Sequence, residues 1–178
     1  MRLIIIFLLL QSCVQSYESP IKIKQRNIDN DLLIEFNKSL IKHEEKKIDS
    51  ILIGSNYVFS KTSTGLRMWI DSVSSTINDK SPKDGNIIQL LYECVVLDDN
   101  QKILNNNLIE GYLTDTISFK LGFSKQMKGL NYAIKLLTVG DKAKIIIPSY
   151  LGFGMSGYGK QVEPYTTLLL NVELLNFK

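Results

Sequence analysis

Residues 126–154 read QMKGLNYAIKLLTVGDKAKIIIPSYLGFG, and this stretch decides the fold of the chain. Apolar residues recur at steps of three, four and three residues in its first part, which predicts a short amphipathic helix over 126–137. They are Met127, Leu130, Ile134 and Leu137. The turn residues 139–141 then lead into the apolar segment 142–147, which predicts a strand directly after the helix.

Further strands are predicted on both sides of this stretch. Apolar and polar residues alternate at 66–71, a long apolar run covers 87–97, and a short strand pattern covers 116–121. A glycine-rich loop at 152–159 precedes a closing strand at 167–175. Five or six strands with one helix between them predict an α+β fold, in which an antiparallel sheet wraps on a short helix.

A helical pattern precedes the sheet. Apolar residues between Asp31 and Leu52 fall on one helical face, which predicts one helix or two. Asn30 or Asp31 is the expected N-cap. We therefore divide the chain into an N-terminal helical extension over 31–64 and a main domain over 65–178.

The first residues are similar to a bacterial lipoprotein signal. Arg2 is followed by the apolar run 3–10 and by a small residue before Cys13. This run is shorter than the roughly 20 residues that a transmembrane helix needs. The similarity implies removal of residues 1–12, lipidation of Cys13, and a polar tether over 13–30 that links the folded part to the membrane. An ordinary N-terminal anchor, or a cleaved signal with a chance cysteine, is the alternative.

The composition limits the available chemistry. His43 is the one histidine and lies among charged residues, while Cys94 is the one other cysteine besides Cys13. Neither a zinc site nor a nucleophile activated by histidine can be assembled from this set, so we expect no metal and no cofactor. Cys94 lies in an apolar stretch and is expected to be a small buried hydrophobe. The formal charge is +3 without a basic run, which argues against nucleic acid as a partner.

The second half, from about Gly85 to Lys178, closely resembles the FKBP-type peptidyl-prolyl cis-trans isomerases. Four fragments carry the resemblance in the order and spacing of that family. They are Gly129-Leu130 through Val139–Lys144, Ile147-Pro148, Leu151–Gly154, and LLLNVELL at 168–175. With its front helix and Thr64-Gly65-Leu66, the chain is most similar to the gliding-motility-associated FKBP-type lipoproteins of gliding bacteria.

The resemblance implies an apolar proline-binding pocket. Tyr92 matches the tyrosine of the central strand, and Phe153 replaces the tyrosine of the loop, so these two are the implied catalytic residues. The implied substrate-binding residues are Ile103, Leu104, Asn105, Ile117, Gln126, Met127, Leu130, Val162 and Leu170. Leu104 or Asn105 stands where the family usually has aspartate. Plain core packing is the alternative for each position, above all for Ile117 and Leu130.

The implied function is peptidyl-prolyl isomerisation that assists the folding of exported proteins. Because Val14 rather than aspartate follows the lipidated cysteine, the resemblance implies the outer membrane, on its periplasmic face. The implied partners are proline-containing exported polypeptides, the membrane through the lipid, and a second copy through the N-terminal helices. The alternative is a non-catalytic FKBP-fold binding module or chaperone within a motility or secretion apparatus.

Overall fold

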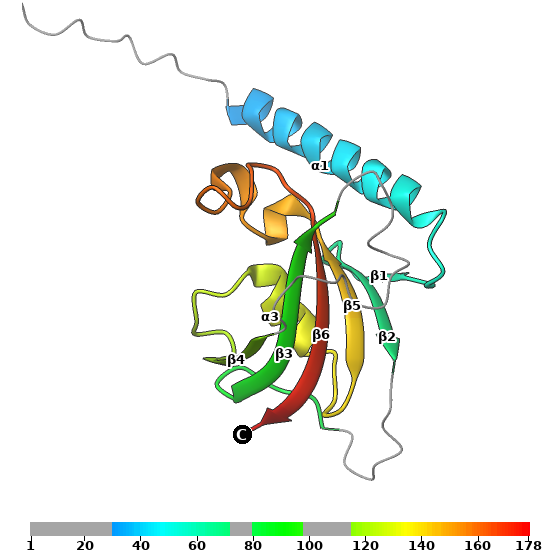
Figure 1. Cartoon of the computed structure of the whole chain (residues 1–178). Helices are drawn as coiled ribbons and strands as arrows, with labels where there is room; N and C mark the ends of the chain where they lie inside the picture. Colours follow the sequence, from blue (N-terminus) through cyan, green and yellow to red (C-terminus); the bar gives the residue numbers. More distant parts are fainter. Residues whose placement is uncertain (1–29, 72–79, 98–114) are drawn as a thin grey trace, which may run out of the picture.

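The computed structural model describes residues 30–71, 80–97 and 115–178, in which one long helix lies across the end of a twisted sheet (Figure 1). The elements are α1 (Asn30–Leu52), β1 (Ser60–Lys61), β2 (Arg67–Asp71), β3 (Ile87–Val96), β4 (Asp115–Lys120), α3 (Lys128–Ile134), β5 (Lys142–Ile147), the 3-10 turns η1 (Ser149–Leu151) and η2 (Gly154–Ser156), and β6 (Leu168–Phe177). Within these residues no helix is long and apolar enough to cross a membrane.

The sheet has six strands in the order β1-β2-β5-β6-β3-β4, and every neighbouring pair is antiparallel. The central pair, β3 and β6, extends from Ile88 opposite Phe177 to Val96 opposite Leu168. Its register shifts between Gln89 and Leu90, an irregularity of the kind that increases local twist. The α+β class and the antiparallel sheet expected from the sequence are confirmed.

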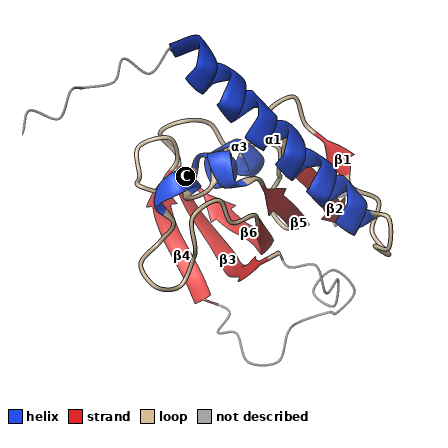
Figure 2. Ribbon diagram, turned by 90° about the horizontal axis from the view of Figure 1, so that it is seen from above, coloured by secondary structure: helices blue, strands red, loops and turns tan. Residues whose placement is uncertain are grey.

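The inner face of the sheet, which we define as the face that carries α3, holds the main hydrophobic core (Figure 2). Leu130 and Ile134 of α3 are fully buried against it. A Cβ atom on Gly129 would lie only 2.6 Å from Cγ2 of Ile147, so the small residue lets the helix approach β5 closely. Gly129 therefore has a packing role.

The second half of α1 packs on the opposite, outer face of the sheet. Ile48 and Ile51 are buried there. Their partners in this second cluster are Val95, Leu97, Ile146 and Leu169. Arg67, itself only 2% exposed, donates from Nε and Nη2 to Oδ1 of Asp49 on α1, at 2.9 and 2.7 Å. Apolar burial, this ion pair and a second one between Lys61 of β1 and Glu45 of α1, at 3.1 Å, thus attach the helical extension to the sheet.

Glu44 attaches α1 to the loop that follows β5. Its carboxylate accepts hydrogen bonds from the Ser149 N–H at 2.6 Å, the Ser149 hydroxyl at 2.8 Å and the Thr167 hydroxyl at 2.6 Å. Ser149 and Thr167 bound the segment 149–167, which we call the crossing loop. One side chain of the helix therefore holds both ends of this loop.

The boundaries differ from the sequence expectation in three places. The front helix is a single one that ends at Leu52, which resolves the choice between one helix and two. α3 is shorter than the expected 126–137, because Met127 has an extended backbone and because Leu136 and Leu137 bond three residues back, as in a 3-10 turn. β1 was not expected: its two residues pair with Arg67 and Met68, and no local pattern marks so short a strand.

Candidate functional site

Strands β3, β4 and β6 place three of the sequence-predicted site residues on the inner face. Tyr92 on β3 lies opposite Val172 of β6, and Ile117 on β4 lies opposite Leu90 of β3. Leu170 on β6 lies opposite Cys94 of β3. Because side chains two residues apart on a strand share a face, this register places Tyr92, Ile117 and Leu170 on the same side of the sheet.

Seven of the predicted residues join one apolar cluster. Its buried members are Met127, Leu130 and Leu170, and its partly exposed members are Tyr92, Ile117, Phe153 and Val162. Leu130 and Leu170 have no exposed surface and belong to the core, and their role in substrate binding stays a prediction. The four partly exposed side chains form the apolar wall, a name we keep for this set.

The remaining predicted residues do not join the wall. Gln126 lies outside the apolar cluster, and its backbone carbonyl accepts a hydrogen bond from Nδ2 of Asn131 at 3.3 Å. Ile103, Leu104 and Asn105 lie outside the described residues, as does Cys13. Their roles stay predictions.

Tyr92 is the polar group of the apolar wall. Burial, followed by the neighbouring Cys94 thiol, raises the pKa of the Tyr92 hydroxyl far above its usual range. Burial also raises the pKa of Cys94, and the interaction with the Tyr92 hydroxyl offsets this in part. Both groups therefore stay neutral at physiological pH, and the Tyr92 hydroxyl remains a neutral hydrogen-bond donor.

The crossing loop supplies an aromatic stack. The rings of Phe153 and Tyr158 lie 4.9 Å apart between centroids, at an interplanar angle of 27°. The Tyr158 N–H donates to the Val162 carbonyl at 2.8 Å, which closes the loop around these rings. Gly157 allows this closure, since its φ is +62° and a Cβ atom would collide with the Val162 carbonyl oxygen.

Tyr158 was missed by the sequence reasoning. The sequence did contain a signal: Tyr158 lies between Gly157 and Gly159. Because the two glycines have no side chain, Tyr158 is the residue of this tripeptide that can pack against the protein. The stack extends the wall beyond Phe153 with a ring that is 58% exposed. Tyr158 therefore adds aromatic surface next to Phe153, whereas other predicted pocket positions, such as Ile117 and Leu130, carry aliphatic side chains.

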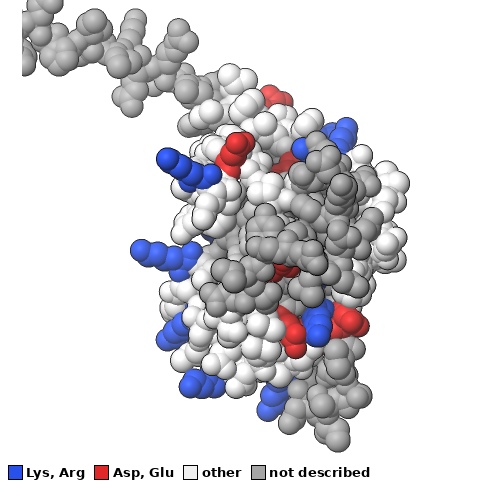
Figure 3. Space-filling model, viewed as in Figure 1, with Lys and Arg blue, Asp and Glu red and all other residues white. Residues whose placement is uncertain are grey.

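Within the described residues, no group of three histidine, cysteine or acidic side chains could hold a metal ion. On the described part of the face in Figure 3, Lys and Arg side chains are dispersed, with Asp and Glu among them. What the wall can supply is an apolar surface with one neutral donor.

A groove lies beside the wall, between α1 and the crossing loop, and we call it the α1 groove. Its volume is about 830 Å³. Apolar residues that line it include Leu40, Ile41, Val96, Met155 and Tyr165. Met155 and Tyr165 are 70% and 51% exposed, so the groove is open to large side chains from outside.

The sequence and the fold both match known proteins. The sequence model of the family described as "FKBP-type peptidyl-prolyl cis-trans isomerase" matches residues 78–175. The peptidyl-prolyl cis-trans isomerase FKBP53 of Arabidopsis thaliana is 32% identical over 99 residues, which cover 56% of this chain and 20% of FKBP53. FK506-binding protein 1 of Eremothecium gossypii is 28% identical over 106 residues, which cover 60% of this chain and 89% of that protein.

The fold has a solved counterpart. The crystal structure of FkpA from Escherichia coli superimposes with a TM-score of 0.56 at 21% identity, and the match covers 83% of this chain and 64% of the FkpA chain. The chain spans only 20% of the length of FKBP53 and 29% of the length of the human isomerase FKBP14. Since the family match covers more than half of the residues, the chain belongs to the FKBP-type peptidyl-prolyl cis-trans isomerase family.

Proposed function

We propose that the protein is a peptidyl-prolyl cis-trans isomerase that acts on exported polypeptides. The observation that carries the proposal is the apolar wall: Tyr92, Ile117, Phe153 and Val162, from β3, β4 and the crossing loop, each stay partly exposed while they pack against the same core cluster. An isomerase of this kind needs a shaped apolar surface and a hydrogen-bond donor, and the site supplies both.

The proposed mechanism depends on the apolar environment that the wall gives to the X-Pro amide bond. Rotation about an X-Pro amide passes through a twisted state, over a barrier of about 18–20 kcal/mol. Twisting removes the resonance and the charge separation of the planar amide, so an apolar surface disfavours the twisted state less than water does. The wall therefore binds the transition state better than either planar form. The neutral Tyr92 hydroxyl can donate to a carbonyl of the substrate without any proton transfer.

Phe153 lowers the expected turnover. At this position the family has a tyrosine, whose hydroxyl could hold the substrate carbonyl, and Phe153 offers only its ring. The loss of one neutral hydrogen bond corresponds to roughly 0.5–1.5 kcal/mol, a rate reduction of about twofold to tenfold. The stacked ring of Tyr158 keeps that end of the wall apolar. We therefore expect a slow enzyme.

We place the enzyme on the outer membrane, facing the periplasm, where it would assist folding of proline-containing exported proteins. The support is the sequence before the folded part: a short apolar run, Cys13, and Val14 in place of aspartate. The same features, with the front helix, support membership of the gliding-motility-associated lipoproteins. α1 begins at Asn30, so a tether from Cys13 would join the membrane to the helix.

The α1 groove favours a second function, that of a binding module or chaperone, alone or beside catalysis. The first half of α1 presents Leu32, Ile34 and Phe36 at 63%, 51% and 57% exposure. These residues could bind unfolded apolar segments or a second copy of α1 in a homodimer.

Sedimentation of the wild type and of the Phe36→Glu variant tests the homodimer. The wild type is expected to be a dimer and the variant a monomer. A wild type that is a monomer contradicts the homodimer.

A protease-coupled assay with a proline peptide tests the isomerase proposal. The wild-type protein should accelerate isomerisation, and Tyr92→Phe should lower kcat/KM by about twofold to tenfold, the equivalent of one neutral hydrogen bond. Tyr132→Phe is the matched control, because Tyr132 lies on α3 and is 40% exposed. A wild-type rate at the uncatalysed background, with a folded protein by circular dichroism, would reject the enzyme and leave the binding function.

A further inference from the structure

The outer face of the sheet carries a buried polar row that isomerisation does not use. The register aligns one residue from each of four strands, β2, β5, β6 and β3. They are Trp69, Lys144, Asn171 and Glu93, each opposite the next. One row closer to α1, the corresponding residues are mainly apolar and covered by the helix. The polar row is therefore the first row of outer-face residues that α1 does not cover.

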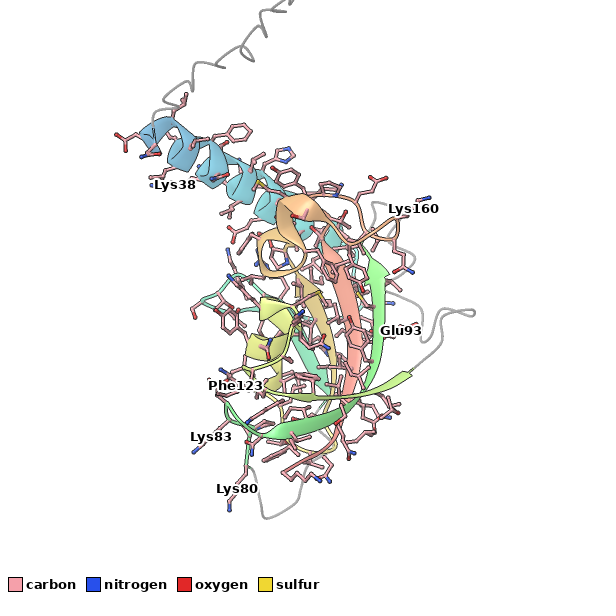
Figure 4. All side chains as sticks on the ribbon, turned by 90° about the vertical axis from the view of Figure 1, so that its left-hand side faces the viewer. Lys38, Lys80, Lys83, Glu93, Phe123 and Lys160 are labelled. Carbon is pink, nitrogen blue, oxygen red and sulfur yellow. The ribbon has the colours of Figure 1, made fainter. Side chains whose placement is uncertain are left out.

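Three residues of the polar row, Lys144, Asn171 and Glu93, form a connected hydrogen-bond network. Lys144 Nζ donates to Asn171 Oδ1 at 3.0 Å, and Asn171 Nδ2 donates to Glu93 Oε2 at 2.6 Å. Glu93 is 5% exposed and lies on the side of the sheet away from α3 (Figure 4). Its second oxygen, Oε1, is buried and has no hydrogen-bond partner. A buried carboxylate oxygen without a donor is costly, so this atom points to a missing ligand.

A hollow of about 450 Å³ lies over the polar row. Tyr57 and Trp69 form one side of it, with ring centroids 4.6 Å apart. Lys144 is already engaged, because its Nζ lies 4.9 Å from the Tyr57 ring centroid and bonds to Asn171. The hollow thus combines aromatic rings with the side chain of Glu93, whose unpaired Oε1 is itself buried.

The charges around the hollow favour a cation. Its lining includes three carboxylates and two ammonium groups. They are Asp71, Glu93 and Glu173, and Lys142 and Lys144. Lys142 pairs with Glu173 at 3.6 Å, and Lys144 is held by Asn171. For Asp71, within the described residues, neither a hydrogen bond nor an ion pair is found, so three carboxylates against two ammonium groups leave one negative charge, while Glu93 keeps one oxygen without a donor.

We propose that this hollow, which we call the outer-face site, binds the basic side chain of a polypeptide, an arginine or a lysine. The Glu93 Oε1 atom can accept a hydrogen bond, and ammonium and guanidinium groups supply a charged N–H donor that quaternary ammonium groups lack. The aromatic rings of Tyr57 and Trp69 suit both the cation and its methylene stem. The site lies on the opposite face of the sheet from the apolar wall, so a polypeptide can engage both at once.

Trp69 is the one tryptophan of the chain, so its fluorescence reports on this site. We would titrate the whole protein with N-acetylarginine amide and N-acetyllysine amide. A saturable change is expected, and Glu93→Gln should weaken binding about tenfold or more, the loss of one charge-assisted hydrogen bond. The substitution preserves shape and still offers Asn171 an acceptor. Asp84→Asn, which removes a carboxylate that pairs with Lys135 elsewhere, is the charge-matched control and should bind like the wild type.

Further probes test whether the site recognises the N–H donor, the positive charge, the apolar stem or the peptide that carries the basic side chain. N-acetylnorleucine amide and tetramethylammonium should fail to saturate the signal, and a capped Ala-Arg-Ala peptide should bind at least as tightly as N-acetylarginine amide. The proposal is overturned if neither basic amide gives a saturable change, if tetramethylammonium binds equally well, or if butylammonium binds more tightly than the peptide. Should Glu93→Gln not fold, the exposed Asp71→Asn variant takes its place, and unchanged affinity there rejects the site.

Discussion

Glu44→Ala tests how far the helical extension stabilises the isomerase site. The carboxylate accepts hydrogen bonds of 2.6, 2.8 and 2.6 Å from Ser149 and Thr167. A hydrogen bond to a charged group contributes about 1.5–3 kcal/mol to stability, and three bonds that share one carboxylate are not additive. Water can replace the glutamate at Thr167 more easily than at Ser149, which is only 4% exposed. We expect a loss of about 3 kcal/mol in the free energy of unfolding.

Urea unfolding followed by Trp69 fluorescence measures this loss. Glu35→Ala is the matched control on the same helix, because Glu35 is exposed, and it should cost less than about 0.5 kcal/mol. Since the crossing loop carries Phe153 and Val162, Glu44→Ala should also lower kcat/KM and speed proteolysis between residues 154 and 166. A loss below about 1 kcal/mol, or one equal to that of Glu35→Ala, would refute the inference that Glu44 holds the loop.

Four other outcomes follow from the same contacts. Phe153→Tyr should raise kcat/KM about twofold to tenfold if a loop hydroxyl holds the substrate carbonyl, and an unchanged rate in a folded variant would show that this contact is not used. The rate on a peptide without ionisable groups should be flat from about pH 5 to pH 8, since Tyr92 and Cys94 both have raised pKa values, and an inflection near neutrality would require another titrating group. At alkaline pH the fold should weaken. The ordinary pKa values of Cys94 and Tyr92 are 9.0 and 10.0, so above them the unfolded chain releases protons that the folded chain retains. The stability that Cys94 and Tyr92 contribute is fully present below about pH 9 and is lost as the pH rises. The lowered pKa of Lys144 has the opposite effect on the free energy of unfolding. Tyr92→Phe should therefore lose less stability between about pH 8 and pH 11 than the wild type, and equal losses would contradict this assignment. Finally, Cys13→Ser should leave an unprocessed precursor that incorporates no labelled fatty acid, and normal processing would reject the lipidation site.

Local pattern was enough for the elements of the fold other than β1. The three- and four-residue steps of Leu130, Ile134 and Leu137 predicted α3, and the apolar runs predicted the strands, because each element must bury one face against another. The four family fragments then ordered the elements into one sheet. Phe153 lies inside one of these fragments, Leu151–Gly154, whereas Tyr92 lies in the apolar run 87–97, which the resemblance matches to the central strand of the family.

The tertiary structure alone decided which distant residues meet. Glu44 lies 105 residues before Ser149 and 123 before Thr167, and nothing near Glu44 in the sequence distinguishes it from Glu45 as the one that binds them. The strand register likewise decides that Asn171 lies between Lys144 and Glu93. Helix and strand periods say which face a side chain occupies, but contacts between faces depend on how the elements dock. For that reason the sequence pointed to the apolar wall, while the contact of α1 with the crossing loop and the outer-face site became visible only in the folded chain.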